Sequence, residues 1–288
     1  MKKLLLCSAC LVLLTSCQAM KHFNPLPYKE SVEVREKVDL TSQYNPTPCF
    51  DRTGYVYHYI KSNQDDSLPA DVWIYYTSPY HSESFKIYPM SKIQGFLDCV
   101  VANYNPSTFQ AKTLEGKRVR KNGKIQDGIV GTLDNYERKV IMGKKEMVNE
   151  IGIQPCYDIN FDLTDMNSML PFLKDNKKDF SFGLTNVRKD SLLAQPSFLY
   201  LGELKASYIG EEEYKGKTCS IYSLSLQNFE ELDGKMYIDT LTNDLVEVNT
   251  KLCGNPFYKN FKFTLIDKQR TTEEEWLTFM RIHAKEKL

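Results

Sequence analysis

Short runs in which aromatic and β-branched residues alternate with polar ones fill the chain from Gly54 onward, and they constrain its fold more than any other feature. The clearest run is Asn260–Ile266, where Phe261, Phe263 and Leu265 occupy every second position. Successive side chains of a strand point to opposite faces, so such a run has one buried and one wet face. The pattern predicts an antiparallel β-sheet.

The same signature recurs along the chain, with turn-forming residues between the runs. We expect strands at Tyr55–Ile60, Val72–Tyr76, Phe85–Tyr88, Phe96–Tyr104, Ile129–Leu133, Lys139–Met142, Phe198–Ile209, Thr218–Leu226, Lys235–Thr240, Leu245–Leu252 and Asn260–Ile266. We expect turns at Asn122-Gly123, Lys215-Gly216, Asp233-Gly234 and Thr242-Asn243. Many short strands joined by such turns indicate an all-β protein.

The first strands differ from the last one because they are apolar on both faces. Tyr57 and Tyr59 alternate with Val56, and Trp73 and Tyr75 alternate with aliphatic neighbours. An apolar sheet face must be covered by a helix, by a second sheet or by a ligand. Both faces of this part of the sheet are therefore expected to be at least partly covered.

Helices are scarce in the sequence. Asp165–Leu173 can form a short helix with an apolar side, and Thr272–Ala284 forms a longer one whose start carries a Thr272/Glu275 capping box. Two helices cannot hide so large a sheet, whereas a sheet that folds over its own concave face can. We predict a mainly-β fold, a strongly curved antiparallel sheet forming an unclosed barrel, with a few short helices plugging the concave face and a C-terminal helix.

Three consecutive segments of the second half carry a resemblance to a known family. They are Tyr214–Tyr222 with its Lys-Gly turn, Gly234–Asp239 of the pattern G-x-x-Y-I-D, and Asp244–Val248, which reads D-L-V-E-V. This succession resembles the LolA-like lipoprotein-carrier superfamily of half-open β-barrels. The resemblance implies that the three segments are neighbouring strands, that Asp239–Asp244 is a tight turn, and that the concave face holds an acyl chain or another apolar ligand.

Candidate ligand-lining residues follow from the apolar strands and the first helix. They are Tyr57, Tyr59, Trp73 and Tyr75 on the sheet, with Met166, Met169 and Leu170 as a plug. Each alone fits ordinary core packing as well. We expect a non-catalytic protein that binds a lipid or acyl chain. Two alternatives stay open: an envelope interaction module that binds a protein or a glycan without a cavity, and an enzyme of unrecognised type.

The first seventeen residues have the layout of a bacterial lipoprotein signal. Lys2 and Lys3 precede the apolar stretch Leu4–Leu14, and Leu14–Cys17 reads Leu-Thr-Ser-Cys. The apolar stretch is too short to span a membrane, which takes about 20 residues. We predict cleavage before Cys17 and lipidation of Cys17, with secretion in a non-lipidated form as the alternative.

The expected organisation has three parts. Residues 1–16 form the signal peptide, residues 17–50 the lipidated and proline-containing tether, and residues 51–288 a single curved β-sheet domain. Gln18 is not the aspartate that retains lipoproteins at the inner membrane, and no acidic surface-export patch follows it. We therefore expect the lipid anchor to hold the protein in the outer membrane, on its periplasmic leaflet.

Charge and reactive groups exclude several function classes. The chain has 37 basic and 37 acidic residues, and this balance argues against nucleic acid as a partner. Its basic run, residues 117–124, suits a solvated hairpin. The sequence contains no G-x-S-x-G and no H-E-x-x-H motif, and His58 is its only histidine inside an expected strand.

We therefore predict no catalytic residue, no metal and no cofactor. A pair of carboxylates such as Glu203 and Glu247 would suit glycoside hydrolysis, provided that the two carboxylates face each other. The cysteines expected to be buried free thiols are Cys49, Cys99, Cys156, Cys219 and Cys253.

Overall fold

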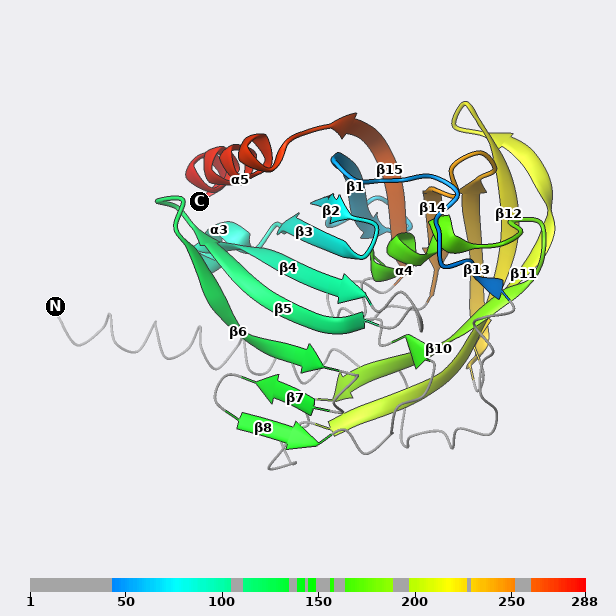
Figure 1. Ribbon diagram of the computed structural model, residues 1–288, viewed down its shortest axis with the longest axis horizontal. Coiled ribbons are helices and arrows are strands. Elements are labelled where there is room, and N and C mark those ends of the chain that lie inside the picture. The colour runs from blue at the N-terminus through cyan, green and yellow to red at the C-terminus, as the bar shows by residue number, and fades with distance from the viewer. Residues whose placement is uncertain are drawn as a thin grey trace, which may run out of the picture.

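The structure, a computed structural model, describes residues 43–104, 111–134, 139–142, 145–148, 156–157, 164–188, 197–226, 229–251 and 260–288. All strands of these segments belong to one sheet of 15 strands in the order β8-β7-β6-β5-β4-β3-β2-β1-β15-β14-β13-β12-β11-β10-β9. The two ends of this order, β8 and β9, are not paired with each other, so the sheet is curved but unclosed (Figure 1). The predicted fold class is confirmed.

Each predicted run overlaps an observed strand, whereas β5, β8, β9, β10 and helix α3 were not predicted from the sequence. The strands are β1 (Tyr55–Asn63), β2 (Ala70–Ser78), β3 (His81–Ile87), β4 (Phe96–Tyr104), β5 (Ala111–Arg120), β6 (Ile125–Asp134), β7 (Lys139–Met142), β8 (Lys145–Val148), β9 (Cys156–Tyr157), β10 (Phe180–Arg188), β11 (Ser197–Tyr214), β12 (Lys217–Leu226), β13 (Phe229–Asp239), β14 (Leu245–Thr250) and β15 (Phe261–Arg270). The helices are α3 (Ser91–Gln94), α4 (Thr164–Met169), the 3₁₀ turn η1 (Leu170–Phe172) and α5 (Glu273–Lys287).

Three of the four predicted turns are confirmed, and one prediction is wrong. The hairpins turn at Asn122-Gly123, at Lys215-Gly216 and at Thr242-Asn243, with φ of 76° at Gly123 and 53° at Asn243. Gly234, however, lies inside β13. A β-carbon on Gly234 would lie 2.9 Å from Thr250 Oγ1 and 3.2 Å from Leu224 Cβ, so glycine is required there by close packing between strands. The sheet also contains one parallel pair, β9 with β10, which the sequence did not indicate.

The two faces of the sheet carry separate hydrophobic clusters, as the early strands predicted. On β1 and β2, Tyr57, Tyr59 and Ile74 belong to one buried cluster, whereas Val56 and Tyr75 belong to another. Because these residues alternate along their strands, the clusters lie on opposite sides of the sheet. We call the first the concave cluster, since α4 and η1 pack into it, and the second the outer cluster, which α5 covers (Figure 1).

Helix α5 is held over the outer cluster by its cap and its apolar stripe. The Thr272 side chain accepts from the Glu275 backbone N–H, and the Glu275 carboxylate accepts from the Thr272 N–H at 2.8 Å, so the predicted capping box is confirmed. Trp276 is buried against the sheet and donates from Nε1 to Glu83 of β3 at 2.7 Å. The C-terminal helix therefore covers the outside of the curve. Within the described residues no helix has the length and apolarity needed to span a membrane.

Candidate functional site

The concave face is closed by a short plug and by the segment that precedes β1. The plug comprises residues 164–173, that is α4, η1 and Leu173, and the strap comprises residues 43–54. Met169, Leu170 and Phe172 of the plug are at most 3 % exposed and belong to the concave cluster. The plug thus takes part in the core although it contains only two short helical pieces.

Backbone hydrogen bonds tie the strap to the plug. Asn45 donates to the Phe172 carbonyl at 2.7 Å and Cys49 to the Pro171 carbonyl at 2.7 Å, while Tyr44 and Leu173 form an antiparallel bridge. Strap and plug therefore form one cover over the concave face.

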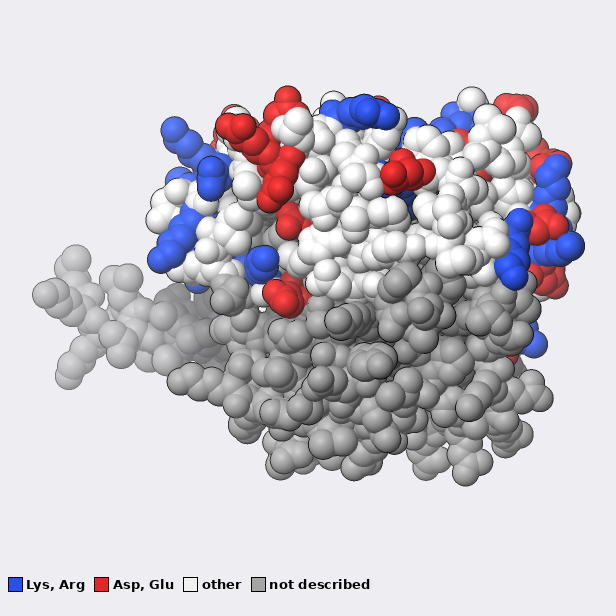
Figure 2. All heavy atoms as spheres, in the orientation of Figure 1, with Lys and Arg blue, Asp and Glu red and all other residues white. Residues whose placement is uncertain are grey.

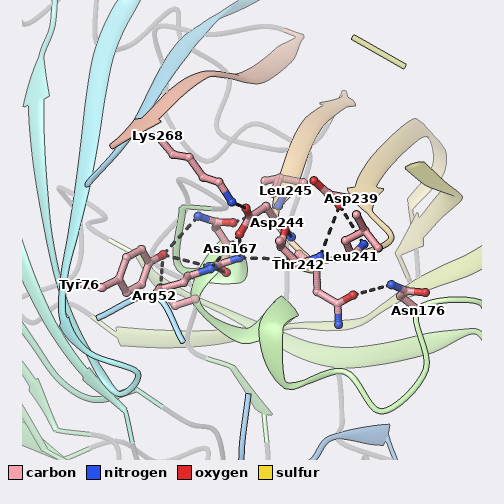
Figure 3. A network of polar contacts seen from close by, with 12 residues as sticks. Arg52, Tyr76, Asn167, Asn176, Asp239, Leu241, Thr242, Asp244, Leu245 and Lys268 are labelled. Atoms are coloured by element: carbon pink, nitrogen blue, oxygen red, sulfur yellow. Dashed lines mark hydrogen bonds and ion pairs between the residues drawn. The ribbon is translucent and has the colours of Figure 1, made fainter. Parts of the chain in front are cut away.

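Arg52 fastens this cover to the sheet (Figure 3). Its guanidinium, 2 % exposed, pairs with Asp244 at 2.9 Å and donates to the Tyr76 hydroxyl and to the Asn243 carbonyl at 3.3 Å each. It also donates to the Asn167 carbonyl of the plug. One planar side chain of the strap thus reaches the plug, strand β2 and the β13–β14 turn, a use that suits the fixed fork of arginine.

Asp244 is the anionic centre of the network. It is fully buried and accepts from Arg52 and, at 2.7 Å, from Lys268 of β15. Burial alone would raise the pKa of Asp244, but the two cations outweigh that effect and hold the pKa below its usual value. Arg52 also lies over the rings of Tyr57 and Tyr76, with its Cζ 5.1 and 5.4 Å from their centroids. The charges of Arg52 and Asp244 are therefore paired with each other, and both side chains are almost completely shielded from solvent.

Further polar contacts of the plug end on the sheet. Asn167 donates from Nδ2 to the Tyr76 hydroxyl at 3.2 Å and accepts at Oδ1 from the Leu245 backbone N–H at 3.2 Å. Ser168 and the Tyr76 hydroxyl lie 3.2 Å apart. The β13–β14 turn adds Asn243, which donates to the Leu173 carbonyl at 3.4 Å. Specific hydrogen bonds thus position the plug in addition to its apolar contacts.

Beneath the plug lies an aromatic layer. The rings of Tyr59 and Phe263 stack at 4.3 Å between centroids, and Tyr57 meets Tyr76 edge to face at 5.6 Å. The Tyr59 hydroxyl donates to the Leu245 carbonyl at 3.1 Å. Burial raises the pKa of Tyr57, Tyr59 and Tyr76, so these phenols stay neutral. The hydroxyls of Tyr59 and Tyr76 are hydrogen-bonded, whereas the buried Tyr57 hydroxyl has no hydrogen-bond partner among the described residues.

The predicted ligand-lining residues fall into two groups. Tyr57, Tyr59, Met169 and Leu170 meet in the concave cluster under the plug. Trp73 and Tyr75 lie on the opposite side of the sheet, in or against the outer cluster below α5. The structure therefore does not bring all of the candidates to one face, because residues 73 and 75 alternate with the inward-pointing 72, 74 and 76.

Two further candidates lie beyond the structural description. The side chain of Met166 is outside the described part of the structure, and so are Cys17 and the whole signal and tether up to residue 42.

The network residues Arg52, Asn167, Asp244 and Lys268 were not predicted from the sequence. Arg52 stands in an aperiodic segment, and Asp244 resembles an ordinary turn residue at the start of a strand. Their partners are as much as 192 positions away. A lone arginine before the first strand and an aspartate before an apolar strand were the signals, and neither specifies a partner.

The three histidines within the described residues have structural partners. His58 lies 2.8 Å from Asp71 and stacks on Trp73, His81 lies 2.6 Å from Asn103, and His283 contacts the Phe279 carbonyl at 3.0 Å. Among the described residues no group of three metal-ligating side chains occurs.

The carboxylates considered for glycoside hydrolysis do not form a free pair. Glu247 accepts from Lys215 at 2.7 Å and from Thr264 at 2.8 Å. Glu203 lies on β11, and strands β12 and β13 separate it from β14, which carries Glu247.

The described thiols are free. Cys99 and Cys219 are buried as predicted, and burial raises the pKa of Cys99 to about 12, which makes it a poor nucleophile. The prediction was wrong for Cys49, which is exposed because it lies in the strap at the surface. The side chain of Cys156 and all of Cys253 lie outside the described residues.

Comparisons with known proteins give structural neighbours of low similarity. No protein-family model matches the chain, and no curated protein matches it by sequence. A beta-barrel-like protein of domain of unknown function DUF1849 from Brucella abortus aligns with TM-score 0.39 and 6 % identity over 77 % of this chain and 100 % of its own. MucB aligns with TM-score 0.30 and 9 % identity over 78 % of this chain, which spans 57 % of MucB.

A putative outer membrane lipoprotein-sorting protein domain from Vibrio parahaemolyticus aligns with TM-score 0.29 and 8 % identity over 79 % of this chain and 91 % of its own. The neighbours thus include the type of domain that the sequence resembles. The half-open curved sheet expected from the resemblance is confirmed by the strand order of this chain itself.

Proposed function

We propose that this chain is a lipid-anchored, non-catalytic protein of the cell envelope that binds an apolar or amphipathic ligand, a lipid or acyl chain, in the concave face of its sheet. One observation carries the proposal: an aromatic concave face is closed by a small plug, and polar contacts of the plug residue Asn167 with Arg52 and with Leu245 hold the plug in place. An apolar chain that replaced the plug would keep the same surface away from water.

The plug is suited to move because little of its stability is its own. Helix α4 has six residues and η1 has three, and helices this short do not persist without tertiary contacts. Opening such a segment costs less than unfolding the sheet, because local units open independently of the most stable core. When the plug moves away, its polar groups can form hydrogen bonds with water instead. The aromatic layer beneath it, in contrast, must be covered by another apolar group to stay out of water.

The membrane anchor in this proposal is Cys17. The signal-like segment before Cys17 and the residue that follows it, Gln18, support lipidation and retention in the outer membrane on the periplasmic leaflet. Several acyl chains on one residue anchor a protein stably, since each buried methylene contributes about 0.8 kcal/mol. Labelling with a radioactive fatty acid tests the anchor, and the label is expected to disappear in Cys17→Ala. Co-migration with inner-membrane markers would contradict the proposed location.

An interaction module without a lipid cavity is the second candidate. A shallow open groove on α5, lined by Glu274, Glu275, Thr278, Phe279 and Ile282, favours it, because a partly apolar groove beside carboxylates suits a protein or glycan surface. Binding to a glycan array or to a protein partner, in the absence of any bound lipid, would favour this candidate.

Native mass spectrometry of residues 18–288, purified without detergent from cells, tests the first proposal. All described contacts lie within residues 43–288, so this form retains every one of them. We expect an additional mass equal to a lipid or fatty acid, which is lost on collisional activation. A protein that never carries such a mass, and that also fails to bind a fluorescent fatty acid added at saturating concentration, would refute the proposal.

A variant pair makes the test specific for the plug. Arg52→Lys weakens the attachment of the cover, so a larger fraction of molecules is open and the apparent affinity for the fatty acid rises. Arg270→Lys is the matched control, because the Arg270 side chain is exposed and donates to the Tyr55 hydroxyl at 3.1 Å, away from the plug. Equal affinities of both variants and the wild type would show that the plug does not control access.

A further inference from the structure

One end of the molecule gathers positive charge from three separate elements. The hairpin between β5 and β6, the last turns of α5 and the short helix α3 meet there (Figure 1), and Figure 2 shows a concentration of Lys and Arg over this end. The basic side chains of this basic end are Lys92, Lys121, Lys124, Arg281, Lys285 and Lys287. Arg118 and Arg120 lie beside them on the other face of β5, because Val119 between them is buried in the outer cluster below α5. The hairpin supplies the run that the sequence had indicated as a solvated turn.

Contacts between the elements hold these cations together. The hairpin closes through hydrogen bonds from Gly123 to Arg120 at 2.7 Å and from Arg120 to Lys124 at 2.9 Å. Arg281 of α5 lies directly on the turn, since a β-carbon on Gly123 would be 3.1 Å from Arg281 Cγ. Lys285 follows Arg281 one helical turn later. The end of the helix and the tip of the hairpin therefore present one surface.

Helix α3 adds apolar side chains beside the cations. Ile93 is 79 % exposed and Met90 is 42 % exposed. Phe96, three residues after Ile93, pairs in register with Arg120 and lies 4.1 Å from the guanidinium of Arg118. Two exposed apolar side chains, Ile93 and Met90, thus stand next to a group of positive charges.

Acidic side chains at this end are few. Asp98 lies opposite Arg118 in the register of β4 and β5, and Glu286 lies in the last turn of α5. The cations are in clear excess although the whole chain has a formal net charge of zero. Segregation of charge in a neutral protein points to a polyanionic partner.

We propose that the basic end docks on the surface of an anionic phospholipid bilayer, with Ile93 and Met90 inserted among the head groups. Lys and Arg near a negatively charged membrane strengthen binding about fivefold each, and adjacent apolar side chains add the burial that fixes orientation. The contact is separate from the acyl chains expected on Cys17. It would orient the anchored sheet relative to the membrane.

Vesicle co-sedimentation of residues 18–288, which lack an acyl chain, tests this inference directly. The probes are vesicles of phosphatidylglycerol mixed with phosphatidylcholine and vesicles of phosphatidylcholine alone. We expect binding to the anionic vesicles only, with loss of binding in about 1 M salt, where charges are screened beyond about 3 Å.

The decisive variants reverse charge or remove the apolar tip. Lys121→Glu combined with Lys124→Glu lowers the net charge by four units. This double variant is expected to lower the partition coefficient for the anionic vesicles by more than about a hundredfold. Lys235→Glu with Lys251→Glu makes the same change in net charge on exposed positions of β13 and beyond β14, and is expected to lower it far less. Ile93→Ser should weaken binding about tenfold, against no change in Leu241→Ser, whose side chain is 85 % exposed elsewhere.

Several outcomes would overturn the inference. Equal loss in the two charge-reversal variants would show that net charge alone governs binding. Binding to neutral vesicles as strong as to anionic ones would remove the role of the cations. Binding to a duplex oligonucleotide without binding to anionic vesicles would identify a different polyanion.

Discussion

Removing the charge of the buried Arg52 should destabilise the protein more than removing the charge of an exposed arginine. In Arg52→Met the side chain keeps a similar length, but Asp244 loses one of its two cations and the carbonyls of Asn167 and Asn243 lose a donor. Breaking a buried ion pair by removing one partner costs about 3–5 kcal/mol. Lys268 still partly neutralises Asp244, so we expect about 4 kcal/mol.

Urea unfolding followed by circular dichroism measures this loss. Arg270→Met is the control, and its free energy of unfolding should change by less than about 0.5 kcal/mol because the side chain is exposed. Arg52→Lys, which keeps a cation near Asp244 but cannot reach all four partners, should fall in between at about 2 kcal/mol. This milder variant stays measurable if Arg52→Met is largely unfolded.

A double-mutant cycle separates the ion pair from the other bonds of Arg52. Arg52→Met combined with Asp244→Asn removes both charges of the buried pair. The free energy of unfolding lost in the double variant should therefore be smaller, by about 2 kcal/mol, than the sum of the losses in the two single variants. Additivity within about 0.5 kcal/mol would refute the reasoning, because it would mean that the two side chains do not act on each other.

Three other predictions concern acid, the helix cap and the packed glycine. The pKa of Asp244 is lower in the folded than in the unfolded protein, so the charged Asp244 stabilises the fold above the unfolded pKa of about 3.9, and this stabilisation is lost as the pH falls through the folded pKa. The free energy of unfolding of Asp244→Asn, measured by urea titration, should therefore fall less steeply below about pH 4 than that of the wild type. An equal slope for the two proteins would contradict this prediction. Thr272→Ala removes the side chain that accepts from Glu275 and should cost about 1 kcal/mol in thermal unfolding, whereas Thr278→Ala, within α5 but away from its cap, should cost less. Gly234→Ala places a β-carbon 2.9 Å from Thr250 Oγ1 and should cost about 1–3 kcal/mol in urea unfolding. Thr250→Ala in the same chain should recover only part of that loss, because alanine lacks Oγ1 but keeps the Cβ that lies 3.0 Å away.

The sheet could be predicted from the sequence because its information is local. Alternation along β1 and β2 indicated two covered faces, and the structure places Tyr57 and Tyr75 in separate clusters accordingly. The Thr272/Glu275 pair indicated the start of α5 within one helical turn. Both patterns depend on neighbours a few positions apart, and such neighbours are visible in one sequence.

The plug network could not be predicted because its information is long-range. Arg52 and Asp244 are 192 positions apart and Tyr76 and Asn167 are 91 apart, and no periodicity connects such pairs. The turn predicted at Asp233-Gly234 was wrong for the opposite reason, since here a local signal was present but misleading. Its Asp-Gly dipeptide fits a hairpin turn, but the glycine is needed where Thr250 and Leu224 crowd the strand. Tertiary packing overrode local turn chemistry there.

The ligand-lining candidates lie on two faces of the sheet for a similar reason, because the face to which a side chain points depends on the tertiary structure. The sequence grouped Trp73 and Tyr75 with Tyr57 and Tyr59 by residue type, yet the pleat of β2 sends the first two outward. Which of two apolar faces is concave depends on the curvature of the whole sheet, and that curvature is not written in any single strand.

Hydrogen exchange of the plug, measured with and without a bound fatty acid, tests the central claim most directly. If the ligand occupies the concave face in place of the plug, the backbone amides of residues 167–173 exchange faster in the complex, while those of α5 on the outer side stay unchanged. Saturating fatty acid that leaves the amides of residues 167–173 unchanged, or protects them, would contradict the claim that the plug yields its place to the ligand.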